Sequence, residues 1–431
     1  MQIVKYPQKG KEYIEITKRA TSDTVEITEL VRNILQEVQH NGDVALQNFS
    51  EKFDKVQLKT FLISQNEINE AIDLVSEELK QAIQTAYHNI EKFHKHQIPN
   101  IDVVETTLGV NCWRQNSAIS NVGIYIPGGT APLFSTVLML AIPARIAGCQ
   151  NVVLCSPPNQ EGKIHEAILY TANLCGVTQI YKIGGAQAIA AMAYGTESIS
   201  KVDKIFGPGN QYVTIAKQLV NVNGVAIDMP AGPSEVLVIG DKKANADFIA
   251  ADLLAQSEHG IDSQSIFVTD NENKLKEVEI AILQQLEQLP RKEITKKALE
   301  NARLVLLQNL DECMDFSNFY APEHLIIQTE NADNLAQKVI NAGSVFIGAY
   351  SPESAGDYAS GTNHTLPTHG FATAYSGVSL DSFVKKITFQ KLSKEGLKNI
   401  GETVEIMAKY EALDAHKNSV SIRLNAITNK D

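Results

Sequence analysis

Strand-like and helix-like segments alternate along the chain from residue 121 onward, and this alternation restricts the possible folds more than any other feature. The run NVGIYIP at 121–127 reads as a strand, TVLMLAIPARIAG at 136–148 as a helix and NVVLCSP at 151–157 as the next strand. The pattern repeats about every 25 residues. A second series runs from EVLVIGD at 235–241 to GSVFIGA at 343–349. Such series predict parallel sheets joined by right-handed crossovers.

The chain has 431 residues, which is too many for one hydrophobic core. We therefore expect an α/β protein with two doubly wound, Rossmann-like parallel-sheet domains and small helical segments at both ends. The expected layout is an N-terminal arm at 1–24, a first α/β domain at 25–120 plus 235–380, an inserted α/β domain at 121–234 and a helical C-terminal segment at 381–431. The last segment is expected to end in a short strand, SVSIRL, at 419–424.

Composition excludes several classes of partner. The formal net charge of −12 argues against binding to nucleic acid or to an anionic membrane through a general field. The beginning of the sequence, MQIVKYPQKGKEYIEI, lacks the apolar core of a signal peptide, and the longest apolar stretch, at 136–149, is too short for a bilayer. Five scattered cysteines without a CxxC pair fit a reducing compartment. We therefore expect a cytoplasmic protein.

Three predicted strands of the first series end in glycine-rich turns. These are IPGGT at 126–130, IGGAQA at 183–188 and FGPGN at 206–210. Ligands of open parallel sheets bind at the carboxyl ends of the strands, where glycine lets the backbone approach a phosphate and a helix N-terminus adds positive potential. None of the three matches GxGxxG or a P-loop. The turns therefore indicate either an atypical nucleotide site or ordinary tight turns.

The second series carries the unusual polar residues. Gln256 and His259 in AQSEHG share one face if the helix continues through both of them. The other candidates are Glu323 and His324 in APEHLII, Asp357, His364 and His369 in GDYASGTNHTLPTHG, and Glu411 and His416 in EALDAHKN. Each alone has an ordinary structural explanation, such as a polar helix end before a glycine cap. Together, imidazoles, a carboxylate and an amide oxygen suit Zn²⁺ or another divalent first-row cation without any thiolate.

Eight motifs along the chain resemble, in the same order, those of the histidinol dehydrogenase family. They are NVGIYIPGG, KIGGAQAIAAMAYGT, VDKIFGPGNQYV, IDMPAGPSEVLVI, DLLAQSEHG, FYAPEHL, GDYASGTNHTLPT and EALDAHKNSV. The resemblance implies a zinc-dependent four-electron oxidation of L-histidinol through L-histidinaldehyde to L-histidine, with reduction of two NAD⁺. This is the last step of histidine biosynthesis. The resemblance also implies one Zn²⁺ per subunit and a swapped homodimer with shared active sites.

The resemblance assigns roles to individual residues. It implies zinc ligands at Gln256, His259, Asp357 and His416, and an acid–base pair at Glu323 and His324. Substrate contacts are implied at Ser234, Gln256, His259, His324, Asp357, His364, Glu411 and His416, and NAD contacts at Tyr125, Gln187 and Asn210. Because the family's C-terminal segment crosses to the partner, Glu411 and His416 are expected to serve the neighbouring subunit's site.

Three classes of function are considered for these residues: an oxidoreductase, a zinc hydrolase and a non-catalytic binding protein. In an oxidoreductase, neutral His324 would accept the alcohol proton and Glu323 would then activate water, so no cysteine nucleophile is needed. A zinc hydrolase would leave the glycine-rich turns without a role. A non-catalytic metabolite-binding relative should lack part of the acid–base pair or of the ligand set, and this chain has all of these residues.

Overall fold

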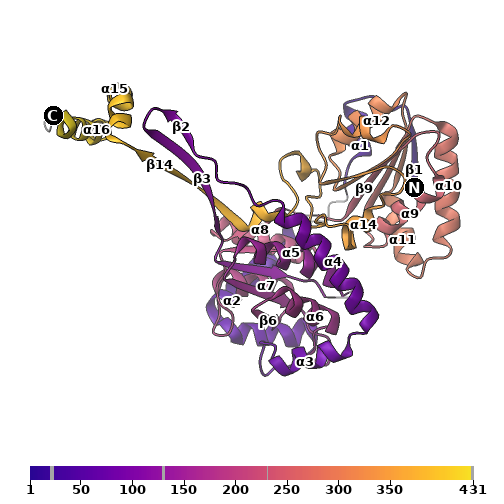
Figure 1. Ribbon diagram of the computed structural model, residues 1–431. Helices are drawn as coiled ribbons and strands as arrows, with labels where there is room; N and C mark the ends of the chain where they lie inside the picture. The colour runs from indigo at the N-terminus through magenta and orange to yellow at the C-terminus, as the bar shows by residue number, and fades with distance from the viewer. Residues whose placement is uncertain (20–23, 129–131, 231, 429–431) are drawn as a thin grey trace. The chain divides into compact units, whose positions relative to one another are not determined.

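The computed structural model describes residues 1–19, 24–128, 132–230 and 232–428. The chain divides into two compact units, one made of Met1–Gln97 and Ile119–Phe383 and the other of Ile98–Ala118 and Val384–Asp431. The first unit contains two parallel sheets and the second an antiparallel sheet with two helices (Figure 1). The predicted α/β class and the parallel sheets are therefore confirmed.

A six-stranded sheet carries the second predicted series. Its order is β1 (Gln2–Lys5), β11 (Arg303–Leu306), β10 (Gln264–Thr269), β9 (Glu235–Gly240), β12 (His324–Gln328) and β13 (Ser344–Ile347), with every pairing parallel. Alternate residues of β9 enter opposite cores: Val236 and Val238 pack on one face, and Leu237 and Ile239 on the other. Burial of both faces is what a doubly wound sheet requires.

Helices supply most of the other residues of these two cores. Helices α9 (Ala246–Ser257) and α10 (Glu272–Leu286) cover one face, and α1 (Lys11–Ile16), α12 (Leu310–Tyr320) and α13 (Ala332–Ala336) cover the other. Shorter elements around this sheet are α11 (Lys292–Ala298), η2 (Leu299–Asn301), α14 (Glu353–Tyr358) and η3 (Phe371–Thr373). The next short helix, η4 (Leu380–Phe383), instead places Phe383 in a core with α5 and α6 of the other sheet. The predicted N-terminal arm, residues 1–24, contributes the edge strand β1 and the helix α1 to this domain.

A five-stranded parallel sheet carries the first predicted series. Its order is β6 (Gln179–Lys182), β5 (Asn151–Ser156), β4 (Asn121–Tyr125), β7 (Lys204–Phe206) and β8 (Ala226–Ile227). Helices α5 (Phe134–Ala147) and α6 (Glu166–Cys175) share one core with this sheet, and α7 (Gly185–Tyr194) and α8 (Gln211–Val222) share the other. The glycine-rich turns thus lie at the carboxyl ends of β4, β6 and β7, as predicted.

The helices before residue 97 pack elsewhere than we predicted from the sequence. Apolar residues of α2 (Thr24–Phe49) lie in the core formed with α7 and α8, whereas α3 (Gln65–Leu74) and α4 (Glu77–Lys95) pack with α5 and α6. A short helix, η1 (Ser50–Asp54), follows α2. These helices therefore belong with the five-stranded sheet and not with residues 235–380. Periodicity reveals which face of a helix is apolar but does not reveal its packing partner.

The second unit differs from the predicted helical C-terminal segment. Strand β14 (Val384–Leu392) pairs antiparallel with β3 (Val110–Ala118), which also pairs with β2 (Val104–Thr107) (Figure 1). Two helices follow, α15 (Lys394–Tyr410) and α16 (Asp414–Thr428). The predicted strand SVSIRL is therefore wrong, because these residues lie within α16. Helices of the described chain are all too short or too polar to traverse a lipid bilayer.

Candidate active site

Glu323 and His324 lie at the start of β12. Helix α12 ends at Tyr320, and Ala321 takes a left-handed conformation with φ of 52° that turns the chain into the strand. Both side chains are buried, with 6% and 4% exposed. Neighbouring residues within a strand point to opposite faces, but the strand begins only at His324, and the Glu323 carboxylate lies 3.6 Å from His324 Nδ1.

One residue of β9 binds both side chains through its main chain. The Glu235 N–H donates to Glu323 Oε2 at 2.8 Å, and the Glu235 carbonyl oxygen lies 3.0 Å from His324 Nδ1. Because a carbonyl can only accept, Nδ1 carries the proton, and in the neutral ring the lone pair belongs to Nε2. Nε2 has no hydrogen-bond partner among the described residues, and Asp357 Oδ1 is 3.6 Å away. The ring is thus held in the tautomer that a general base needs.

Three carboxylates surround this imidazole. Burial by itself would lower the pKa of His324, but the charges of Glu353, Glu323 and Asp357 outweigh it and hold the pKa well above its ordinary value. Burial raises the pKa of Glu323 and of Glu353 to about 8. The proposed base must be neutral to accept a proton, and the negative charge around His324 opposes that state. A cation among these carboxylates would supply the positive charge that the imidazolium otherwise provides.

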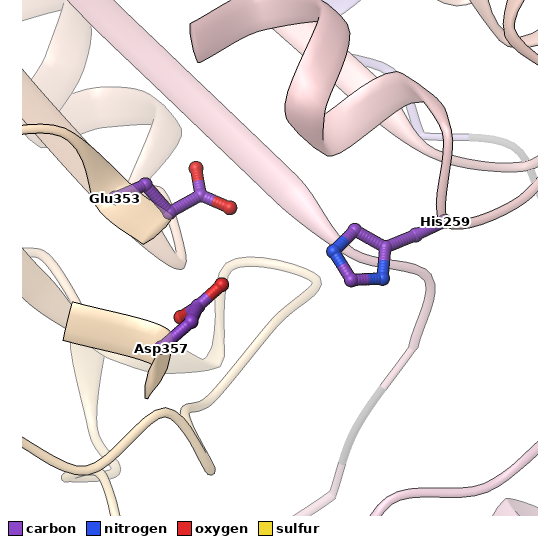
Figure 2. A group of neighbouring side chains, drawn as sticks. All are labelled: His259, Glu353 and Asp357. Carbon is purple, nitrogen blue, oxygen red and sulfur yellow. The ribbon is translucent and has the colours of Figure 1, made fainter. Parts of the chain in front are cut away.

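A candidate metal centre lies beside this pair. One potential ligand atom each from His259, Glu353 and Asp357 lies within 4.8 Å of the others. Figure 2 shows the two carboxylates, both from α14, pointing toward the imidazole, which comes from the loop after α9. Helix α9 ends at Ser257, so His259 does not share a helix face with Gln256 as predicted. The structure brings His259 and Asp357 together and adds Glu353.

Gln256, three residues before His259, is a further candidate ligand. Its side chain is 1% exposed, and neither Oε1 nor Nε2 has a hydrogen-bond partner among the described residues. A buried amide without partners costs about 1 to 3 kcal/mol. Binding of Oε1 to a cation would remove part of this cost. The donor set of one imidazole, one amide oxygen and carboxylates, without sulfur, fits Zn²⁺ or a similar divalent ion.

The remaining predicted substrate residues lie in different settings. His364 has both ring nitrogens engaged, Nδ1 with the Asp357 carbonyl at 2.8 Å and Nε2 with Thr136 Oγ1 at 3.1 Å. Ser234 is half-buried directly before β9. Glu411 and His416 lie in the second unit, at the end of α15 and in α16, and both are exposed.

The three predicted cofactor residues line one cavity in the five-stranded domain. This cavity has a volume of about 1160 Å³, and Tyr125, Gln187 and Asn210 all contribute to its wall. None of the candidate metal residues lines it. Burial raises the pKa of Tyr125 to about 12, so its hydroxyl stays neutral, and it accepts a hydrogen bond from Gly185 N at 3.0 Å. Asn210 caps α8 by accepting from the N–H groups of Tyr212 and Val213.

Glycine is required at one of the predicted turns. Gly207 has φ of 121°, and a Cβ there would lie 2.1 Å from the Tyr125 carbonyl oxygen. The close approach of the two strand ends therefore depends on this glycine. In the first turn, Gly128 lines the cavity, whereas Gly129 and Thr130 lie outside the described residues.

Sequence reasoning missed Glu353, Glu235 and Thr136. Glu353 lies four residues before Asp357 on α14, a helical spacing that could have revealed it. Glu235 contacts Glu323 and His324 through its main chain, and a main-chain contact cannot be predicted from the residue type. Thr136 is 2% exposed at the start of α5, and only the structure brings it to His364.

Known proteins match this chain over almost its whole length. The family model described as histidinol dehydrogenase matches residues 17–424. Histidinol dehydrogenase from Bacteroides thetaiotaomicron is 56% identical over 427 residues, covering 99% of this chain and 100% of the relative, and that of Campylobacter jejuni is 53% identical with the same coverage. The crystal structure of histidinol dehydrogenase from Elizabethkingia anophelis superposes with a TM-score of 0.97 at 56% identity, covering 99% of both chains.

Proposed function

This chain belongs to the histidinol dehydrogenase family and is therefore an NAD-dependent oxidoreductase of histidine biosynthesis, and we propose that the buried Glu323–His324 pair is its acid–base machinery beside a zinc ion. The observation that carries this proposal is the junction of β9 and β12. There one residue, Glu235, holds both side chains, while His324 Nε2 has no hydrogen-bond partner in the described part of the chain.

The proposed zinc ligands are Gln256, His259 and Asp357 from one chain and His416 from a second copy of the chain. Support comes from the proximity of His259 and Asp357 and from the Gln256 amide, which is buried and lacks a hydrogen-bond partner within the described ranges. A bound zinc ion would hold and orient histidinol and, as a positive charge near Asp357, would favour the neutral form of His324. Glu353 places a second carboxylate next to His259 and Asp357.

The chain's own residues account for the proton transfers. His324 Nε2 is proposed to accept the alcohol proton while Nδ1–H stays bound to the Glu235 carbonyl. In the second half-reaction, Glu323 is proposed to take a proton from the water that adds to the aldehyde. The Glu235 N–H, which donates to Glu323 Oε2, orients that carboxylate. Burial of both side chains limits the access of bulk water.

The large cavity of the five-stranded domain is the proposed NAD⁺ site. Its wall includes Tyr125, Gln187 and Asn210, and the N-termini of α7 and α8 lie at the same carboxyl ends of the strands. Bound NAD⁺ would accept hydride from the substrate carbon in both half-reactions.

The substrate contacts proposed at Ser234, His364 and Glu411 complete the active site, with Glu411 supplied by the second copy of a homodimer.

The test counts NADH released per histidinol by absorbance in zinc-loaded enzyme. The four-electron course predicts about two NADH per histidinol, and one NADH with accumulated aldehyde would refute it. The His324→Gln variant should lose both half-reactions. Retention of alcohol oxidation in that variant would show that the base lies elsewhere.

A further inference from the structure

Arg19 makes an unusually complete set of contacts for a residue of the N-terminal segment. Its Nε lies 2.5 Å from Glu235 Oε1 and its Nη2 lies 3.0 Å from Oε2, which is the bidentate geometry of a strong arginine–carboxylate pair. The side chains of Arg19 and Glu235 are only 15% and 2% exposed. The N–H of His369 also donates to Glu235 Oε1 at 2.8 Å. The Glu235 carboxylate is thus fixed from several directions.

The main chain of the same glutamate binds the proposed catalytic pair. Glu235 N–H donates to Glu323, and Glu235 C=O accepts from His324. A shift of the Glu235 backbone would change both the contact that sets the tautomer of His324 and the contact that orients the Glu323 carboxylate. Whatever anchors the Glu235 side chain therefore controls both groups.

Arg19 also binds the segment that leads into the pair. Its Nη2 donates to the Tyr320 carbonyl oxygen at 2.7 Å, and its guanidinium carbon lies 4.1 Å from the centre of the Tyr320 ring. Tyr320 Oη donates to Gln264 Oε1 at 2.8 Å, and Gln264 Nε2 donates to the carbonyl of Lys18, the neighbour of Arg19, at 3.2 Å. One guanidinium therefore joins β9 to the turn before Glu323.

We propose that Arg19 is a positioning residue of the oxidation reaction, holding Glu235 and Tyr320 so that Glu323 and His324 keep their reactive geometry. This inference rests on the roles proposed above for the pair. A buried ion pair is a weak source of net stability, since an apolar pair often serves as well, so stability alone gives little reason for this one. Displacement of a catalytic group by about 1 Å can cost about 100-fold in rate.

The experiment compares Arg19→Gln, Arg19→Lys and Glu235→Gln as zinc-loaded enzymes. For each variant it measures kcat and KM with histidinol and with histidinaldehyde, the zinc content and the thermal midpoint. Two matched controls are available. Lys9→Gln removes an exposed pair of the same segment, Lys9 Nζ to Asp315 Oδ2 at 3.1 Å, and Leu286→Ala opens the core of α10, where Leu286 is 5% exposed. The second control lowers stability without touching the site.

Arg19→Gln is expected to lower kcat by about 10- to 100-fold for both substrates, with KM for histidinol within about twofold and zinc content unchanged. Arg19→Lys should recover part of the loss, because it restores the charge without the bidentate contact. Both controls should keep kcat. If Arg19→Gln does not fold, Glu235→Gln carries the same expectation.

Three results would overturn the inference. The first is a folded Arg19→Gln or Glu235→Gln enzyme whose kcat is within about twofold of that of the parent, and the second is a loss confined to KM or to zinc content. The third is a Leu286→Ala enzyme that has the same thermal midpoint as Arg19→Gln and loses as much kcat. His324→Gln separates this inference from the proposed function. A dead His324→Gln beside a normal Arg19→Gln rejects only the positioning role, whereas an active His324→Gln rejects the proposed base itself.

Discussion

Replacing Gln256 with methionine should have opposite effects on the metal-free and the zinc-loaded enzyme. Methionine has nearly the same length but needs no hydrogen bonds. Gln256 is 1% exposed, and both of its polar atoms lack partners among the described residues. Removing a buried, unpaired amide should therefore stabilise the metal-free protein by about 1 to 3 kcal/mol. For the larger compact unit, which has roughly 360 residues, that corresponds to a rise of roughly 1 to 4 °C in the midpoint of unfolding.

The same substitution should weaken zinc binding by at least about 10- to 100-fold, the loss typical of changes in the groups around a metal. The assay is differential scanning calorimetry of chelator-treated and zinc-loaded protein, with zinc affinity from competition with a coloured chelator. Gln256→Glu is the matched comparison, because it keeps an oxygen donor but adds charge. A lower midpoint of the metal-free Gln256→Met protein, or unchanged zinc affinity, would refute the reasoning.

Three further outcomes are expected. Glu323→Gln should slow oxidation of histidinaldehyde more than oxidation of histidinol, and equal losses in single-turnover assays of the two steps would contradict the water-activating role. Burial raises the pKa of Asp252 to about 7, so the folded protein holds a proton that the unfolded chain releases near pH 4. The contribution of Asp252 to the free energy of unfolding therefore falls as the pH rises from about 4 through 7. Asp252→Asn should therefore flatten the pH dependence of urea unfolding by on the order of a few kcal/mol between pH 4 and 8, and an unchanged slope would count against this. Asn210→Asp should keep the cap of α8 and raise KM for NAD⁺ through charge repulsion. Asn210→Ala should raise KM for NAD⁺ and, because the cap is lost, lower the free energy of unfolding by about 1 kcal/mol. An unchanged KM in both variants would exclude Asn210 from the cofactor site.

Continuous apolar runs predicted the central parallel strands well, because these strands are buried on both faces. Alternation was misleading at 419–424, where Val420, Ile422 and Leu424 alternate with polar residues as in a strand. In the structure Leu424 lies on α16, and a Cβ added to Gly401 of α15 would lie 2.8 Å from its Cδ1. The two helices pack closely at this glycine, and a local alternation of apolar residues cannot predict such packing.

Strand β14 was missed for a similar reason. Its sequence, VKKITFQKL, is rich in lysine, and most of its residues are exposed. Its strand conformation depends on pairing with β3, more than 260 residues earlier, where Trp113 stacks on Phe389 with ring centres 5.4 Å apart. Long-range pairing of this kind is invisible to a local pattern.

The candidate site was predictable only in part. Motif resemblance led to His259, Asp357, Glu323 and His324, which the structure places around one another. The proposed role of Arg19 could not have been inferred from the sequence, because it rests on contacts with residues more than 200 positions away.

Anomalous diffraction at the zinc absorption edge, from crystals of the zinc-loaded enzyme, tests the central claim most directly. The account predicts one strong peak per subunit, bound by Gln256 Oε1, by His259 and Asp357 of the same chain and by His416 of a second copy, next to His324. A peak bound by Glu353 in place of Gln256, or by residues away from the Glu323–His324 pair, would contradict it.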